Sequence, residues 1–291
     1  MELSLQYKEM FNRNIGFVSE TEQTTLQKTP VFVAGVGGMG GACLMSLVRS
    51  GFESLGIADI DTFDVSNINR QVFSNLSTVK QDKAVATIEQ IKNLNPSAQV
   101  INWGHEWLSK LDEILKIYKI VVNGTDDVRA TLQLYRKAKE YGCIVIDAYT
   151  SPLPSVYVTG PQDPRPEERL KFPTVGREIS SLTTQDLDKC KFAEVVHVMA
   201  HSTSINHIDF DLAVEMVSGK RPRMSLAPMV ITTGNLMAYQ VIYLVLSRTK
   251  KTDPEGYFLN PLKGRVERPS FFILRKIKEF VVRRYLLKVL A

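Results

Sequence analysis

Two cations and a carboxylate lie close to the ends of expected strands. Arg70 belongs to the segment DIDTFDVSNINRQVF, Lys83 opens the next amphipathic stretch, and Asp126 follows the apolar run KIVVN. Guanidinium and ammonium groups neutralise phosphate oxygens, and a carboxylate is a preferred ligand of Mg²⁺. If the fold brings these three side chains together, they would suit a nucleoside triphosphate that arrives with magnesium.

The order of the expected elements predicts that they meet. Apolar runs alternate with amphipathic stretches, and continuous apolar strands are typical of a mostly parallel sheet covered on both faces. The carboxyl ends of parallel strands lie at one edge of the sheet. The side chains that should therefore face one crevice are Asn67, Arg70, Lys83, Asp126 and Asp127. We expect strands at residues 30–36, 54–60, 99–103, 119–125, 143–150 and 154–160, and helices near 39–50, 80–95, 106–116 and 127–141.

A glycine-rich turn links the first strand to its helix. Gly35, Gly37, Gly38 and Gly40 in GVGGMG would let a phosphate approach the helix N-terminus. Asp59, at the end of the second strand, could accept hydrogen bonds from both hydroxyls of a ribose. These features alone fit the pyrophosphate of a nicotinamide or flavin dinucleotide as well as they fit ATP.

The charge of the phosphate favours ATP. A dinucleotide bridge carries roughly two negative charges and a triphosphate about four, which calls for cationic clamps and a carboxylate for the metal. Taken singly, Arg70 and Lys83 could be ordinary surface cations, and Asp127 could cap the helix that begins there. Taken together, at the ends of successive strands, they indicate a triphosphate site.

After residue 150 the pattern changes. Residues 161–191, with four prolines and many charges, predict a long exposed crossover loop, followed by a helix near 192–218. The stretch from 224 to 247 carries no charged residue, but it contains proline, glycine and asparagine, so we interpret it as a packed core helix rather than a membrane span. The segments GYFLNP and GRVERPSFF are possible further strands in a smaller C-terminal elaboration.

Composition indicates a soluble globular protein. The chain has 291 residues, of which 44% are apolar and 23% are charged. No apolar stretch follows a basic one at the start, and the three cysteines form no C-x-x-C pair, so we expect a cytoplasmic protein without a structural zinc. We predict one α/β domain with a Rossmann-like, mostly parallel sheet, in which residues 1–150 form a nucleotide-binding half and 151–291 a substrate-side half.

The basic character of the chain is a property of its tail. The last 21 residues, FFILRKIKEFVVRRYLLKVLA, hold six basic residues and one acidic residue, a net charge of +5 that equals that of the whole chain. Ile273, Ile277, Phe280 and Val281 would share one side of a helix. We expect this tail to dock on its own protein or on a partner subunit in preference to a membrane surface, and we expect no DNA partner.

The chain resembles the ThiF/MoeB/HesA family, the bacterial relatives of ubiquitin-activating enzymes. The resemblance rests on NRNIGF (12–17), GVGGMG (35–40), DIDTFDVSNINRQ (59–71) and GTDDVRAT (124–131), and more weakly on a pattern that begins at Ala227. It implies an ATP-dependent adenylyltransferase of the ubiquitin-like modifier activating type. Such enzymes use ATP and Mg²⁺ to activate a carboxylate, usually the C-terminus of a small sulfur-carrier or ubiquitin-like protein or of a peptide, as an acyl-adenylate.

The resemblance also implies roles for individual residues. Gly38 would lie against the nucleotide, Asp59 and the neighbouring Asp61 would belong to its ribose side, and Asp126 would coordinate Mg²⁺. Contacts to the phosphates would come from Asn67, Arg70 and Lys83. Arg13 is similar to an arginine that reaches across a homodimer interface into the partner's site.

Four features depart from the family or stand outside its pattern. Asp126-Asp127 replaces the usual Asp-Asn, and the zinc-binding cysteine pairs of many members are missing. Cys190, which we expect to be exposed, is the one candidate for a thiol that would accept an acyl group. His197, His201 and His207 include an i, i+4 pair that could bind a metal, with Glu194 a turn earlier, but we interpret them as histidines of a helix face or core.

Competing functions remain at this stage. A tRNA-modifying dehydratase of the same family would use the same site on another carboxylate. A nicotinamide-dependent oxidoreductase would fit the glycine turn with Asp59, and a non-catalytic nucleotide-binding partner would keep the site without turnover.

Overall fold

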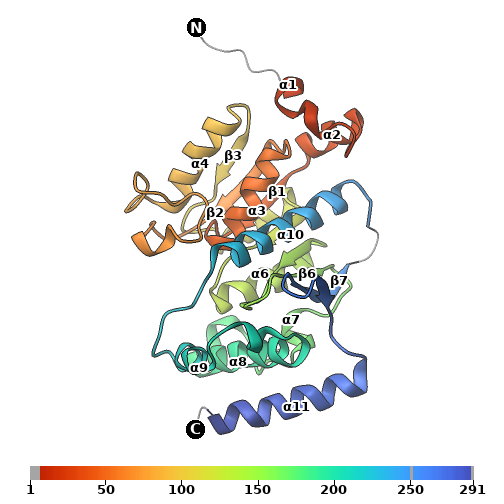
Figure 1. Ribbon diagram of the computed structural model, residues 1–291. Helices are drawn as coiled ribbons and strands as arrows, with labels where there is room; N and C mark the ends of the chain where they lie inside the picture. The colour runs from red at the N-terminus through yellow and green to blue at the C-terminus, as the bar shows by residue number, and fades with distance from the viewer. Residues whose placement is uncertain (1–6, 250–251, 290–291) are drawn as a thin grey trace.

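The computed structural model describes residues 7–249 and 252–289. In this part of the chain, eight strands form one sheet of order β3-β2-β1-β4-β5-β6-β7-β8 (Figure 1). Strands β1 to β5 pair in parallel, and β6, β7 and β8 add an antiparallel extension. The strands span Val31–Ala34 (β1), Ser54–Ala58 (β2), Gln99–Asn102 (β3), Ile120–Asn123 (β4), Ile144–Asp147 (β5), Ser155–Thr159 (β6), Asp253–Asn260 (β7) and Arg265–Glu267 (β8). The predicted mostly parallel α/β fold is confirmed.

Helices alternate with the parallel strands as the sequence predicts, and further helices follow. Those before and between the parallel strands are α1 (Tyr7–Phe11), α2 (Glu20–Lys28), α3 (Gly38–Arg49), α4 (Lys83–Leu94), α5 (Leu111–Ile117) and α6 (Val128–Glu140). Those after β6 are α7 (Pro166–Arg169), α8 (Thr184–His201), α9 (Phe210–Val217), α10 (Ala227–Val245) and α11 (Phe272–Val289). Short 3₁₀ turns occupy Asn12–Asn14 (η1), Val65–Asn67 (η2), Ile179–Ser181 (η3) and Ser204–His207 (η4).

Both faces of the central strands β1, β4 and β5 are buried, which is why these strands read as continuous apolar runs, whereas the edge strand β3 is largely exposed. On β1, Val31 and Val33 belong to the core on the side of α3, α4 and α10, whereas Phe32 and Ala34 belong to the core on the side of α5 and α6. All four residues are fully buried. This two-sided packing fixes the strand ends, and therefore the edge at which the predicted site should lie.

The charge-free stretch forms α10, which packs beside α3 (Figure 1). By length and composition alone, α10 is the one helix of the described chain apolar enough to cross a membrane. Packing inside the protein also explains the apolar composition of α10, because this helix lies against α3 and against strands β5 and β6. Gly234 allows the close approach, since a Cβ there would lie 2.5 Å from the carbonyl oxygen of Met39.

The region from 161 to 191 differs from the prediction of a long exposed loop. Leu170, Phe172 and Leu182 are buried in a third apolar cluster beside β6 and β7. The sequence does not indicate this burial, because these apolar residues are isolated among charged ones. The helix expected at 192–218 is two helices, and the first of them, α8, begins at Thr184. Thr183 and Asp186 cap it reciprocally, because the Thr183 hydroxyl accepts from the Asp186 amide and the Asp186 carboxylate accepts from the Thr183 amide.

The basic tail forms α11, which packs along α8 at the end of the molecule opposite α1 (Figure 1). The side that faces the molecule carries Arg275 and Glu279, with Leu286 buried. The apolar side predicted to dock is solvent-exposed by more than half at each of its residues Ile273, Ile277, Phe280 and Val281. The helix therefore docks through a mixed polar face, stabilised by ion pairs that its amphipathic pattern does not reveal.

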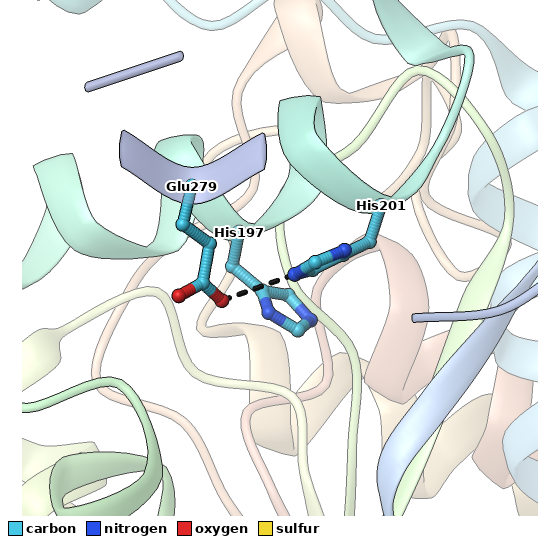
Figure 2. A group of neighbouring side chains, drawn as sticks. All are labelled: His197, His201 and Glu279. Atoms are coloured by element: carbon cyan, nitrogen blue, oxygen red, sulfur yellow. Dashed lines mark hydrogen bonds and ion pairs between the residues drawn. The ribbon is translucent and has the colours of Figure 1, made fainter. Parts of the chain in front are cut away.

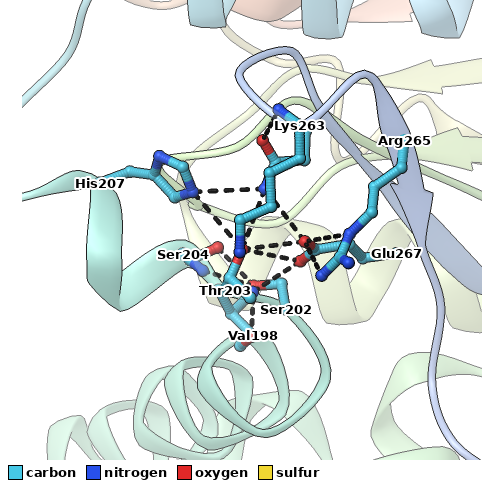
Figure 3. A network of polar contacts seen from close by, with 9 residues as sticks. Val198, Ser202, Thr203, Ser204, His207, Lys263, Arg265 and Glu267 are labelled. Atoms are coloured by element: carbon cyan, nitrogen blue, oxygen red, sulfur yellow. Dashed lines mark hydrogen bonds and ion pairs between the residues drawn. The ribbon is translucent and has the colours of Figure 1, made fainter.

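A buried carboxylate joins β8 to the turn after α8 (Figure 3). Glu267 accepts hydrogen bonds from the backbone amide of Thr203 at 2.6 Å, from the Thr203 hydroxyl at 2.9 Å and from the Asn260 amide at 3.0 Å. Burial alone would raise the pKa of Glu267, but these hydrogen bonds outweigh it and lower the pKa to about 2. We call this group of residues the Glu267 clasp.

Candidate functional site

A cleft of about 480 Å³ lies at the carboxyl ends of the parallel strands. It sits between β1 and β4, where the strand order reverses direction, which is the usual position of a ligand in an open α/β sheet. Its floor is formed by the turn after β1, with Gly35, Gly37 and Gly38, and by the turn after β4, with residues 124–127. The cleft therefore lies at the edge of the sheet where the sequence predicts the nucleotide site.

Backbone packing, rather than side chains, shapes the glycine turn. Gly35 has a φ of +84°, a conformation that favours glycine. A Cβ on Gly40 would lie 1.9 Å from the carbonyl oxygen of Gly35, and a Cβ on Gly35 would lie 2.7 Å from the backbone of Gly124. These contacts press the two turns together and leave the N-terminus of α3 open toward the cleft, where it can receive an anion.

Asp59 stands at the end of β2 with its carboxylate fixed by two backbone amides. Val36 N donates to Oδ2 at 2.8 Å, and Asp61 N donates to Oδ1 at 3.0 Å. Burial raises the pKa of Asp59, against the opposing effect of Lys83 and of these hydrogen bonds. The carboxylate lines the cleft and has lone pairs left for ribose hydroxyls.

Lys83 and Arg70 reach the same cleft from different segments. Lys83 Nζ lies 2.8 Å from Asp61 Oδ2, and the Lys83 side chain is buried while that of Asp61 is exposed. Arg70 Nη1 donates to the carbonyl oxygen of Ser66 at 2.9 Å and to Asn69 Oδ1 at 2.8 Å. Within the described ranges no carboxylate forms an ion pair with Arg70, so its positive charge is available to an anion in the cleft.

Asp126 and Asp127 differ in what they do locally. Asp127 caps α6, because its Oδ1 accepts a hydrogen bond from Ala130 N at 3.0 Å, and the capping interpretation is confirmed. Asp126 also lines the cleft, and its carboxylate has no hydrogen-bond or ion-pair partner among the residues that the structure describes. An exposed, unpartnered carboxylate beside cations fits a divalent metal that accompanies a polyphosphate.

The structure thus brings Arg70, Lys83 and Asp126 into one cleft, with Asp59, Asp61, Asp127 and the three cleft glycines. Three predicted site residues lie elsewhere. Gly40 packs behind the glycine turn, Asn67 closes the η2 turn through a hydrogen bond from Asp64 N to its Oδ1 at 3.1 Å, and Arg13 lies exposed on η1. None of the three belongs to the residues that line the cleft.

The prediction that Cys190 is exposed is wrong. The thiol is fully buried in α8, within the apolar cluster that includes Tyr157 and Leu182. Burial raises its pKa to about 11, which leaves it protonated near neutral pH. The correction follows from the earlier start of α8, which turns this position toward the core.

A second wall of the cleft was missed in the sequence. It consists of Tyr149, Thr150 and Ser151 after β5, and of residues 223–225 with Met229 and Val230 before and within α10. The rule that placed Asp126 at the edge of the sheet could also have indicated Tyr149, which lies two residues after the end of β5. Arg223 could not be predicted in this way, because it lies in the connection before α10, whose position relative to the sheet the sequence does not indicate.

Comparisons with known proteins agree with this geometry. The model of the ThiF family matches residues 11–275. Curated relatives include a probable molybdopterin-synthase adenylyltransferase of Porphyra purpurea, 31% identical over 36% of this chain and 28% of the relative, and a sulfur carrier protein adenylyltransferase of Thermus thermophilus, 31% identical over 43% and 46%. A tRNA threonylcarbamoyladenosine dehydratase of Bacillus subtilis is 37% identical over 31% of this chain and 36% of its own. The matched stretches span less than half of these relatives' lengths.

Solved structures show the same fold at low sequence identity. PaaA superposes with a TM-score of 0.63 at 19% identity, over 94% of this chain and 86% of that chain. The E. coli tRNA N6-threonylcarbamoyladenosine dehydratase TcdA in complex with AMP gives 0.60 at 15%, over 86% and 100%. The Microcin C7 biosynthetic enzyme MccB in complex with N-formylated MccA gives 0.59 at 14%, over 85% and 66%.

Proposed function

This chain belongs to the ThiF family, and we propose that it is an ATP-dependent adenylyltransferase that activates a carboxylate of a protein or peptide. The observation that carries the proposal is the convergence of Arg70, Lys83 and Asp126 on one cleft at the switch point of the sheet. A dinucleotide would need no such set, because the helix N-terminus and the turn can satisfy a pyrophosphate bridge. The adenylyltransferase names of several relatives support the same reaction class.

The reaction follows from the charges that face the cleft. The glycine turn would receive the phosphates at the N-terminus of α3, and Asp59 would bind the ribose. Arg70 and Lys83 would neutralise charge that builds up on the departing pyrophosphate, and Asp126 would hold Mg²⁺, which when bound shields the phosphate oxygens. An oxygen of the substrate carboxylate attacks the α-phosphorus, and the bond to the bridging oxygen of pyrophosphate breaks with its electron pair, leaving an acyl-adenylate.

The acceptor would approach from the wall formed by residues 149–151 and 223–230. Arg223 is exposed there, and no carboxylate within the described chain forms an ion pair with it. A guanidinium at this wall suits the negative charge of an incoming carboxylate. We expect the protein to act in the cytoplasm, where its three free cysteines would stay reduced.

Pyrophosphate exchange into ATP tests the proposal. The acceptors to try are a β-grasp sulfur carrier protein ending in Gly-Gly and a bulk tRNA fraction that carries modified bases. Asp126→Ala should lower the exchange rate at least about a hundredfold, because it removes the proposed metal ligand. Asp188→Ala is the matched control, because it removes an exposed carboxylate that lies outside the cleft and pairs with Lys191, and it should stay within about threefold of the wild type.

Calorimetry measures which nucleotide binds, independently of whether the reaction proceeds. Mg²⁺-ATP should bind with measurable heat and NADH should give none. Heat for NADH alone would overturn the adenylyltransferase in favour of an oxidoreductase, and wild-type exchange by Asp126→Ala would remove the metal role of that residue.

A second candidate is a tRNA-modifying dehydratase that activates a carboxylate on a modified base. It is favoured by the identity of 37% to the Bacillus subtilis dehydratase and by the likeness of the fold to the E. coli enzyme in complex with AMP. Exchange supported by the tRNA fraction and not by the carrier protein would select it.

A further inference from the structure

Two histidines and a glutamate converge where the C-terminal helix meets α8, outside the nucleotide cleft. His197 and His201 are separated by four residues on α8, and Glu279 comes from α11 (Figure 2). One ligand atom of each residue lies within 4.8 Å of the others, and His201 Nε2 is 3.0 Å from Glu279 Oε1. Two imidazoles one helical turn apart plus a carboxylate form a donor set that divalent zinc uses in proteins.

The ring nitrogens of this pair lack partners. His197 is 1% exposed and His201 is 5% exposed. In the described part of the chain, both nitrogens of His197 and Nδ1 of His201 have no hydrogen-bond partner. A buried polar atom without a partner is unfavourable, so three of them at one point indicate a missing group that would bind them.

Arg275 holds the Glu279 carboxylate of this cluster in place, and it is paired with two carboxylates. Its Nε donates to Glu279 Oε1 at 3.1 Å, and its guanidinium forms an ion pair with Glu255. Contacts of this kind to a metal-binding carboxylate orient it in known sites.

We propose that His197, His201 and Glu279 bind one Zn²⁺ ion that joins α11 to α8. The expectation that the chain carries no structural zinc considered cysteine pairs and the histidines of a single helix, and it had no means of placing Glu279 beside them. Tetrahedral coordination needs ligand atoms about 3.4 Å apart, so these atoms, which lie within 4.8 Å of one another, move closer together when the ion binds. The Glu279 side chain is 31% exposed, which gives the ion a path from solvent.

The ion would lie directly behind the acceptor wall of the cleft. The ring of Tyr149, which lines the cleft, packs edge-on against His197 with ring centroids 5.7 Å apart. Three protein ligands leave a fourth position for water. Binding would therefore hold the last helix of the described chain in place and fix the support of Tyr149.

Metal content of the full-length protein tests the proposal. The protein is purified without a histidine tag, dialysed against zinc and then against metal-free buffer, and measured by mass spectrometry of the element. One zinc per chain is expected, and Co²⁺ in its place should give the visible absorption of a tetrahedral site. Titration against a chelating dye then gives the affinity.

Variants locate the ion. Glu279→Gln keeps the shape and a hydrogen-bond acceptor for His201 but removes a ligand charge, and it should weaken zinc at least about a hundredfold. Glu255→Gln is the matched control, because it makes the same charge change beside the same Arg275 and leaves the ligands intact. It should bind zinc within about threefold of the wild type.

Other outcomes would overturn the proposal. These are a wild-type protein that takes up no zinc or cobalt, or an affinity that is equal in Glu279→Gln and Glu255→Gln. If Glu279→Gln proves unfolded by circular dichroism, His201→Gln replaces it, and the cobalt spectrum of the wild type still decides. Because ATP takes no part in these measurements, their result is independent of the proposed adenylyltransferase.

Discussion

The three cysteine thiols, Cys43, Cys143 and Cys190, are all buried and unpaired. Burial raises the pKa of each of them, so the reactive thiolate is scarce at neutral pH. In the native protein a chromogenic disulfide reagent should label less than one thiol per chain in the minutes after mixing, and three in guanidinium chloride. Cys190→Ala should retain pyrophosphate exchange within about twofold. A fast reaction of one thiol that disappears in Cys190→Ala would contradict this.

At the scale of residues, the sequence predicts where charged side chains gather better than it predicts which side chains are buried or touch one another. Arg70, Lys83 and Asp126 could be found because strand ends share an edge of the sheet, so their position along the chain determines their position in space. Cys190 could not be read in the same way, because its burial depends on where a capped helix begins. Glu279 was out of reach as well, since 78 residues separate it from His201 and only the docking of α11 brings them together.

At the scale of elements, the parallel half of the sheet was predictable to within a few residues. Its central strands β1, β2, β4 and β5 are buried on both faces and give clear apolar runs, whereas the edge strand β3 is largely exposed. The connection before α8 and the face by which α11 docks were not, because both depend on polar contacts between distant segments. The α11 helix contacts α8 through Glu279, which pairs with His201, and it contacts β7 through Arg275, which pairs with Glu255. Its apolar stripe stays exposed, so amphipathicity alone indicates the wrong face.

The Glu267 clasp gives stability a defined pH dependence (Figure 3). The pKa of Glu267 is lowered from 4.5 to about 2, so the folded state stabilises the carboxylate. This contribution is complete above about pH 4.5 and is lost as the pH falls toward 2. Glu267→Gln should lower the free energy of unfolding by about 2–3 kcal/mol at pH 7, and the difference from the wild type should shrink as the pH is lowered below 4.

Urea unfolding followed by circular dichroism at several pH values measures this difference. Glu106→Gln is a suitable control, because Glu106 forms an exposed ion pair with Lys110 and should change stability by no more than about 0.5 kcal/mol. A loss for Glu267→Gln that is constant from pH 7 to pH 3 would show that the charge of the clasp is not what stabilises it.

At the scale of the whole molecule, Arg13 lies exposed on η1 and away from the cleft of its own chain. If two copies assemble so that each Arg13 serves the other's cleft, Arg13→Ala and Asp126→Ala should each be inactive alone. Mixed in equal amounts under conditions that allow exchange of subunits, they should recover about a quarter of the wild-type exchange activity, because half of the dimers are mixed and each has one intact site. Recovery of no activity, or a monomer in sedimentation, would refute a shared site.

The two walls of the cleft come from separate stretches of the chain. The wall that we propose to bind the nucleotide comes from residues 35–127, and the wall that we propose to receive the acceptor comes from residues 149–230. A genetic crossover near residue 148 would therefore deliver a new acceptor surface to an unaltered nucleotide wall. The contact between Gly38 and Val230 limits such exchange, because a Cβ on Gly38 would lie 2.6 Å from Cγ1 of Val230. Any donor segment must bring a side chain at position 230 that leaves room for the backbone of that glycine.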